Sequence, residues 1–339
     1  MNTKELLFKL CEQDFIGSVH DCAKTVELLI SPYVDEIQHR NDGTVCAIKH
    51  GNGKKIMLEA HIDQIGFIVT EVFDDGFLRL QKVGGIDIRT LPASEIKIHG
   101  KEIVYGAVCS VPPHLQKSKS EKFPSIDECF VDTCLGEKLK DVVSVGDYAV
   151  YSNTPVSLMS GRVSSRSLDD RSACAALILA AESLSEKDVK STVIYQFSQA
   201  EELGGSGAKT ATFDMNVDCA LACDVSFGDG EDVKPHECGK LGEGPMIGYS
   251  PSLSRHTSDI MVSVAERENI PYQKEIMNGR TGTDADHIAI TRSGVECGLV
   301  SIPLRYMHTP VETVELCDID NTAGIMVGFV LEKDGELCD

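Results

Sequence analysis

Apolar residues recur at helical spacing near the start of the chain, over residues 5–11 and 20–34. Each of these patterns predicts a surface helix. Short apolar runs at Thr44–Lys49 and Lys55–Ala60 are separated by Gly51–Gly53, which is typical of a turn between two strands. The first part of the chain therefore predicts two helices followed by two strands.

The pattern changes between about residues 67 and 160, where short runs rich in valine and isoleucine alternate with glycine, aspartate and proline. Such a pattern is typical of a small β-barrel. The stretch from Pro112 to Leu139 has mixed charge and two adjacent prolines, so we expect a long exposed loop there. No group of residues in this region indicates catalysis, and His114 is interpreted as a loop residue rather than as a ligand.

Helical and strand-like segments alternate again in the rest of the chain. They are a helical stretch at 172–182, a strand at 191–198, apolar runs at 219–223 and 296–302, and helices at 252–269 and 316–332. Alternation of this kind is typical of an α/β domain. With 339 residues, of which 42% are hydrophobic, the chain has the length of two domains.

Composition excludes several classes of function. The formal net charge of −21 disfavours nucleic-acid binding, which needs clustered lysine and arginine, and no stretch approaches the roughly 20 apolar residues of a membrane span. The N-terminal stretch lacks the apolar core and cleavage site of a signal peptide. The 13 cysteines are odd in number and irregular in spacing, which indicates reduced thiols. We therefore expect a cytoplasmic protein with no nucleic-acid or membrane partner.

Four apolar runs each end in, or are followed by, a side chain that can bind a metal ion. These side chains are His61, Glu202, Asp224 and His308. In open α/β sheets the binding crevice lies outside the carboxyl ends of the strands, so residues far apart in the sequence meet there. Asp169 joins them from a connection between a strand and a helix, which brings the set to two imidazoles and three carboxylates.

Two of these motifs have a plainer explanation when each is taken alone. Adjacent Glu201 and Glu202 suit the solvated start of a helix, where acids interact favourably with the helix dipole. His61 and Asp63 can be a chance surface pair. The convergence of four separate runs on one edge of a sheet argues against coincidence.

The donor set indicates the kind of ion. Imidazoles with carboxylates suit two divalent ions such as Zn²⁺, Co²⁺ or Mn²⁺ with one bridging carboxylate, whereas a structural zinc site is richer in cysteine. Two such ions can activate a water molecule and polarise a substrate carbonyl, and this chemistry needs a further carboxylate as a base. Glu201 is placed for that role because it precedes Glu202 and is not required to bind metal.

The motifs also carry a family resemblance. In order along the chain they are Ala60–Asp63, Leu168–Arg171, Glu201–Gly205, Asp224–Val225, Gly282–Ala285 and Arg305–Pro310, with Val83–Asp87 and Pro112–His114 between them. They resemble the family-42 metallopeptidases of the glutamyl and tetrahedral aminopeptidase type. The resemblance covers nearly the whole chain, and six motifs in one order are highly specific.

The resemblance implies a fold, an activity and an assembly. The fold is a Zn-peptidase-like α/β domain, with a mixed sheet flanked by helices, formed by residues 1–66 and 161–339. Residues 67–160 form an inserted small β-barrel domain for oligomerisation and access control. The activity is that of an aminopeptidase with two divalent metal ions per subunit, zinc or cobalt ahead of manganese, which removes N-terminal residues from short peptides. The assembly is a homo-oligomer, either a dodecamer or a dimer.

The resemblance also assigns the metal ligands by position. His61 binds one ion, Asp169 bridges both, Asp224 completes the first site, and Glu202 with His308 holds the second ion. Asp170, next to the bridging residue, is expected to cap a helix.

Two further residues match catalytic positions of the family. Glu201 corresponds to the base, and Asp63 to the acid that orients His61. The chain departs from the family at Gln64, where relatives commonly have an acid, so substrate preference and metal affinity stay open. The free amino terminus of a substrate needs an acidic partner, either a metal-site carboxylate or Asp284, which can equally serve to order its own loop.

Three other interpretations compete with an aminopeptidase. A carboxypeptidase or amide deacylase uses the same dinuclear chemistry but needs a cation for the substrate carboxylate, a role open to Arg280 or Arg305. A glycosidase uses two carboxylates that flank a sugar, and it has no need of His61 and His308. A non-catalytic metal-binding assembly protein is the third, and the presence of Glu201 argues against it.

Overall fold

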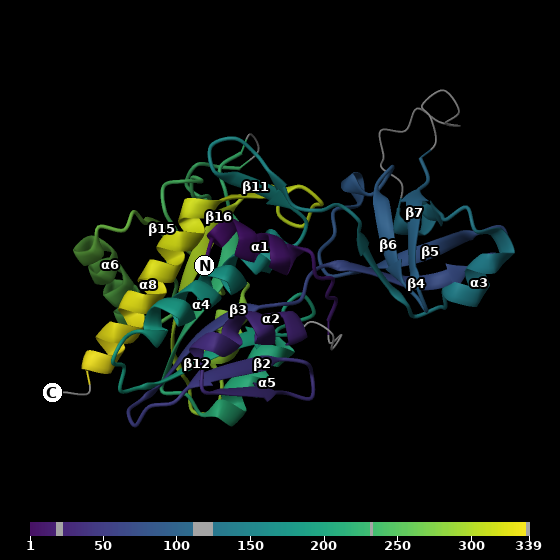
Figure 1. Cartoon of the computed structure of the whole chain (residues 1–339). Coiled ribbons are helices and arrows are strands. Elements are labelled where there is room, and N and C mark those ends of the chain that lie inside the picture. Colours follow the sequence, from purple (N-terminus) through teal and green to yellow (C-terminus); the bar gives the residue numbers. More distant parts are fainter. Residues whose placement is uncertain (18–22, 111–124, 231–232, 337–339) are drawn as a thin grey trace. The chain divides into compact units, whose positions relative to one another are not determined.

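The structure is a computed structural model that describes residues 1–17, 23–110, 125–230 and 233–336. Its chain divides into two compact units (Figure 1). Each unit has buried hydrophobic residues that pack together within it. The larger unit comprises Met1–Asp63, Pro155–Met307 and Val311–Asp339, and the smaller unit comprises Gln64–Thr154 and His308–Pro310.

An eight-stranded mixed sheet forms the centre of the larger unit, in the order β1-β2-β12-β3-β13-β16-β14-β15. The strands are β1 Glu36–His39, β2 Val45–Lys49, β3 Lys55–His61, β12 Thr192–Ser198, β13 Cys219–Phe227, β14 Met246–Tyr249, β15 Gln273–Ile276 and β16 Glu296–Leu304. Strands β12, β3, β13 and β16 are parallel neighbours, so their carboxyl ends lie at one edge. β2 and β14 flank this parallel group as antiparallel strands.

Helices cover both faces of this sheet. The helices are α1 Thr3–Cys11, α2 Ala23–Ile30, α4 Leu168–Ser185, α5 Ser206–Met215, α6 Arg255–Glu268, α7 Asp284–Ala289 and α8 Leu316–Gly335. Helices α1, α2, α4, α6 and α8 share one apolar core with the sheet, and α5 and α7 share another. Because side chains alternate across a strand, Ile56 and Leu58 of β3 belong to the first core and Met57 to the second.

A small three-stranded sheet leads the chain into α4. Its strands are β10 Val156–Ser157, β11 Arg162–Ser165 and β17 Glu312–Glu315. Ser167, between β11 and α4, adopts a left-handed conformation with φ of 58°. Asp169 and Asp170 then follow with non-helical dihedral angles inside the first turn of α4, so both carboxylates leave the regular helix pattern.

The smaller unit is a closed barrel with the strand order β4-β5-β8-β7-β6-β9. The strands are β4 Gly66–Val72, β5 Phe77–Val83, β6 Glu95–His99, β7 Ile103–Val108, β8 Phe130–Asp132 and β9 Tyr148–Tyr151. Short helices lie at Ile88–Thr90, Ile126–Glu128, Gly136–Lys138 and Leu139–Val142 (α3). Inward-facing residues such as Phe67, Leu78 and Ile96 fill the barrel, as closure of a small barrel requires.

The predicted fold class is confirmed, since a mixed sheet flanked by helices accompanies a closed barrel of six strands. The long exposed loop expected over 112–139 is wrong in its second half, because β8 pairs there with β5 and β7. A strand of three residues is too short to show a period of two. The first half, which contains His114 and the motif Pro112–His114, lies outside the described residues, as does the start of the predicted helix 20–34.

Within the described ranges, no helix combines the length and the apolar composition needed to cross a bilayer.

Candidate metal centre and active site

His61 stands at the centre of the candidate site. It is the last residue of β3, it is buried, and it lies beside Ser198, the last residue of β12. Its Nε2 atom is 3.0 Å from Oδ1 of Asp169 and 3.9 Å from Oδ1 of Asp224. One nitrogen of the imidazole therefore faces carboxylates that come from α4 and β13.

Two groups of possible metal ligands share this histidine. His61, Asp169 and Glu202 each offer a ligand atom, and these atoms lie within 4.8 Å of one another. His61, Asp170 and Asp224 form a second group by the same measure, with all three residues buried. The larger unit thus brings together four of the five predicted metal ligands and adds Asp170 to them.

The electrostatics of these groups fit divalent cations. Both carboxylate oxygens of Asp170 are buried with no hydrogen-bond partner in the described part of the chain. Burial, and then the charge of Asp224, raise the pKa of Asp170 well above its ordinary value. Burial likewise raises the pKa of Asp224. Buried carboxylates without partners are strongly unfavourable, and a divalent ion with oxygen and imidazole ligands removes this penalty.

Asp63 contacts the opposite side of the imidazole. Nδ1 of His61 lies 3.5 Å from Oδ1 of Asp63 and 3.1 Å from its backbone oxygen. A proton on Nδ1 that points to Asp63 leaves the lone pair of Nε2 directed at the other acids, as a metal ligand requires. Burial disfavours the charged imidazole, but hydrogen bonds to Asp169 and Asp63 outweigh it and raise the pKa of His61 well above its ordinary value.

Glu201 lies in a tight loop that follows β12. Its backbone N–H donates to Oδ1 of Asp63 over 3.0 Å, so Asp63 contacts both the histidine and this loop. Burial raises the pKa of Glu201 to about 8; the charge of His61 opposes this rise and that of Asp284 adds to it. This rise belongs to the cation-free site, and divalent ions bound beside the carboxylate would favour its ionised form, which a general base requires.

His308 and Gln64 belong to the smaller unit. Nδ1 of His308 lies 3.1 Å from the carbonyl oxygen of Gly85, and a Cβ atom added to Gly85 would come within 2.6 Å of that nitrogen. Gln64 is buried. The assignment of His308 as a metal ligand stays a prediction.

Sequence reasoning missed or misplaced several acids of the site. The expectation that Asp170 caps a helix is wrong, because neither of its carboxylate oxygens has a hydrogen-bond partner among the described residues and the carboxylate joins the ligand group. Asp224 lies inside β13, which continues to Phe227, rather than at the end of the strand. Buried Glu312, whose Oε2 accepts the backbone N–H of Asp169 over 3.2 Å, was missed although it follows the motif Arg305–Pro310.

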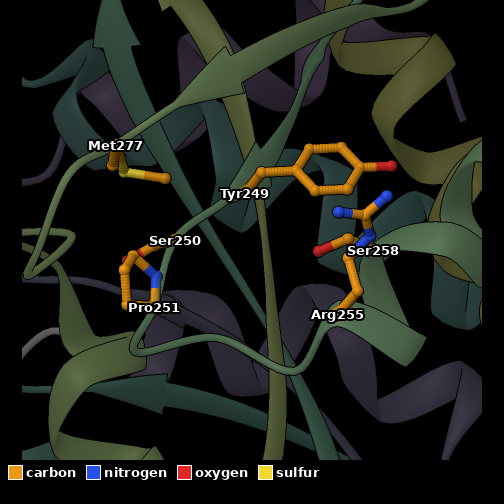
Figure 2. Close-up of a pocket in the computed structure, with 6 residues that line it drawn as sticks. All are labelled: Tyr249, Ser250, Pro251, Arg255, Ser258 and Met277. Atoms are coloured by element: carbon orange, nitrogen blue, oxygen red, sulfur yellow. The ribbon is translucent and has the colours of Figure 1, made fainter.

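A separate cavity of about 320 Å³ is lined by Tyr249, Ser250, Pro251, Arg255, Ser258 and Met277 (Figure 2). In this view the guanidinium group of Arg255 lies beside the ring of Tyr249. Cζ of Arg255 is 4.9 Å from the centroid of that ring. Arg255 also forms an ion pair with Asp259. The cavity contains none of the predicted site residues, so we assign it no part in the reaction.

Comparison with known proteins shows the family. Residues 43–325 match the family model described as M42 glutamyl aminopeptidase. A lysyl aminopeptidase of Pyrococcus furiosus is 31% identical to the chain over 87% of its length and 86% of the relative. An aminopeptidase structure from the archaeon Desulfurococcus kamchatkensis has a TM-score of 0.91 and 32% identity, and covers 97% of this chain and 94% of its own.

A second solved structure is the TET1 peptidase of Pyrococcus horikoshii, described as able to assemble into a tetrahedron or a large octahedral shell. It has a TM-score of 0.85 and 28% identity, and the match covers 96% of this chain and 98% of that one. Together with the motifs and the ligand groups around His61, these matches establish that the chain belongs to the M42 family of glutamyl aminopeptidases.

Proposed function

We propose that this metal-dependent aminopeptidase uses two divalent ions to remove N-terminal residues from short peptides in the cytoplasm. The observation that carries the proposal is the pair of ligand groups that share His61 beside the half-buried carboxylate of Glu201. The ligands we assign are His61, Asp169, Glu202, Asp224 and His308, and the ions are zinc or cobalt, with manganese as a further choice. Asp170 provides a further carboxylate in the ligand group that contains His61 and Asp224.

The residues of the chain divide the chemistry between them. The bound ions supply Lewis acidity toward the peptide carbonyl and the developing oxyanion. Glu201 takes a proton from the attacking water on its carboxylate and delivers it to the nitrogen of the leaving amine, a transfer typically worth about 10²–10⁴ in rate. Asp63 keeps the proton of His61 on Nδ1. The many carboxylates around the site attract the positively charged amino terminus of a peptide.

We assign the α/β part, residues 1–66 and 161–339, to catalysis and the β-rich part, residues 67–160, to assembly and access. A homo-oligomer, as a dodecamer or a dimer, is supported by the assembly described for the relative from Pyrococcus horikoshii. An assembly that encloses its active sites admits short peptides and excludes folded proteins.

The rival activities differ in the substrate group that they bind. A carboxypeptidase needs a cation for the substrate carboxylate, but Nη2 of Arg305 is already paired with Asp229 over 2.8 Å. A panel of aminoacyl chromogenic amides, N-blocked peptides and cellulose, each with single added metals, distinguishes the classes. We expect cleavage of the free aminoacyl amides alone, whereas turnover of the blocked peptides or of cellulose would overturn the assignment.

Glu201→Gln tests the base directly, and Glu243→Gln, at an exposed surface pair with Lys240, is the matched control. We expect kcat to fall about 10²–10⁴-fold in the first variant, with bound metal unchanged, and to stay at the wild-type value in the second. Near-normal turnover of the Glu201 variant would eliminate the proposed base.

A further inference from the structure

Asp284 is a buried acid close to the site that the proposed mechanism does not use. It is the first residue of α7, and only 3% of its surface is exposed. Its Oδ2 accepts a hydrogen bond from Oγ of Ser198 over 2.6 Å, while Oδ1 is buried without a hydrogen-bond partner among the described residues. A carboxylate enclosed in this way is poorly placed to capture the amino terminus of a substrate, which favours a role in ordering the structure.

Ser198 marks the start of the loop that carries the two glutamates. It is the last residue of β12, and its backbone oxygen accepts the N–H of Ile62 over 2.8 Å. Its hydroxyl oxygen lies 2.6 Å from Oε1 of buried Glu59 as well as from Asp284. Asp284 is therefore tied to the last residue before the loop.

Gly205 marks the end of the same loop and lies against the same aspartate. A Cβ atom added to Gly205 would lie 2.8 Å from Oδ1 of Asp284 and 2.1 Å from Cδ2 of His287, closer than non-bonded atoms approach. Its φ of +68° also lies in the left-handed region that favours glycine. The backbone at Gly205 thus lies so close to α7 that only a residue without a side chain fits there.

Hydrogen bonds inside the loop connect its two ends. The N–H of Gly204 donates to the carbonyl of Glu201, and the N–H of Gly205 donates to the carbonyl of Ala200, each over 2.8 Å. A displacement at either end therefore moves Glu201 and its neighbour. We propose that Asp284 is a positioning residue that binds the start of the loop Gln199–Gly205 through Ser198, lies against its end at Gly205, and so fixes the two glutamates beside His61.

The consequence for catalysis rests on the proposed function, whereas the consequence for the loop does not. Misplacement of a reacting group by about 1 Å can lower a rate about 10²-fold. We therefore expect Asp284→Ala to lower kcat more than it raises KM. Asp284→Asn has the same shape and keeps an oxygen acceptor for the Ser198 hydroxyl, so its kcat should be at least tenfold higher than that of Asp284→Ala.

Hydrogen exchange of the metal-free protein tests the positioning role without reference to activity. Amides of the loop are followed by mass spectrometry in the wild type, in Asp284→Ala and in Ser198→Ala, which breaks the same contact from the other side. The control is Asp286→Asn on the same helix, because the carboxylate of Asp286 accepts the backbone N–H groups of Thr281 and Gly282 and, within the described residues, forms no hydrogen bond with the loop. We expect exchange of residues 199–205 to accelerate at least about tenfold in both test variants and not in the control.

Each outcome decides the proposal. Unchanged exchange in Asp284→Ala, or an equal rise in Asp286→Asn, would overturn it, since the aspartate would then do no more than stabilise α7. If Asp284→Ala does not fold, Ser198→Ala decides alone by the same criterion. Absence of aminopeptidase activity in the wild type would refute the proposed function and leave the exchange result intact.

Discussion

We expect the protein without divalent ions to become less stable as the pH rises. The acids around His61 have pKa values raised by burial, and without cations they ionise against one another. A group whose pKa is higher in the folded than in the unfolded chain holds extra protons in the folded state between the two values. The stability that such a group contributes is therefore largest at low pH. It is lost as the pH rises through the pKa of the group in the folded state.

Glu201 gives the scale of the effect. A rise in its pKa from 4.5 to about 8 corresponds to about 5 kcal/mol at 1.36 kcal/mol per pH unit. Water entry and relaxation of the neighbouring acids reduce this ceiling, so we expect a loss of about 2 kcal/mol between about pH 5 and about pH 8. The raised pKa of His61 contributes with the same sign.

Burial also raises the pKa values of Glu59, Asp284 and Asp318, so these acids act with the same sign as Glu201. Acids whose pKa is lowered in the folded protein do not add to the change within this window. Against the effect of burial, the hydrogen bond from Lys333 lowers the pKa of Glu296, and hydrogen bonds from Ser191 lower that of Asp334. A lowered carboxyl pKa contributes stability that is lost only as the pH falls below the ordinary value. The contributions of Glu296 and Asp334 therefore change below about pH 4.5 and are constant above it.

The assay is urea unfolding of chelator-treated protein at about pH 5.5 and about pH 8, with and without added zinc. We expect the metal-free protein to be less stable at the higher pH and zinc to stabilise it most there. Glu201→Gln should remove about 2 kcal/mol of the pH dependence in the metal-free state. A metal-free protein whose free energy of unfolding stays level or rises across this window would refute the reasoning.

Three further variants test separate contacts. His308→Ala should reduce the bound metal measured by mass spectrometry, and an unchanged stoichiometry would contradict its role as a ligand. Asp63→Asn should lower metal affinity or activity about 10–100-fold, because it removes the negative charge of a carboxylate whose Oδ1 lies 3.5 Å from Nδ1 of His61 and accepts the backbone N–H of Glu201; wild-type values for both would contradict that role. Lys333→Met should lower the free energy of unfolding by about 1–3 kcal/mol, because the Lys333 side chain is only 2% exposed and its ammonium group binds Glu296 over 3.0 Å. Lys190→Met, at an exposed pair, should change it by less than about 0.5 kcal/mol.

The parallel core of the sheet could be predicted because its strands are nearly continuous apolar runs. Strands β3, β12 and β13 are buried along almost their whole length, and the polar residues that interrupt or end them stand out. His61 and the glutamate pair were found in this way. The edge strands were missed because β15, with the sequence Gln273–Ile276, alternates exposed and half-buried residues over only four positions.

The acids that sequence reasoning missed or misassigned depend on contacts and backbone geometry that the pattern of apolar residues does not show. Glu59 lies inside an apolar strand, where a single acid resembles a solvated residue until Ser198 and Asp284 are seen beside it. Asp170 lies where the first turn of α4 has non-helical dihedral angles, and its buried carboxylate joins the ligand group instead of accepting a backbone N–H of the helix. Hydrophobic periodicity shows only which face of a helix or strand is buried. It predicts neither the contacts between distant segments nor a local change in backbone dihedral angles.

The central claim is that acids and histidines from distant segments gather two ions beside a free carboxylate. The most direct test is a crystal structure with zinc or cobalt bound, examined by anomalous scattering. We expect two anomalous peaks about 3.5–4 Å apart, contacted by His61, Asp169, Glu202, Asp224 and His308, with Glu201 beside them but bound to neither. Peaks at other places, or these five side chains directed away from one another around an empty site, would contradict the account.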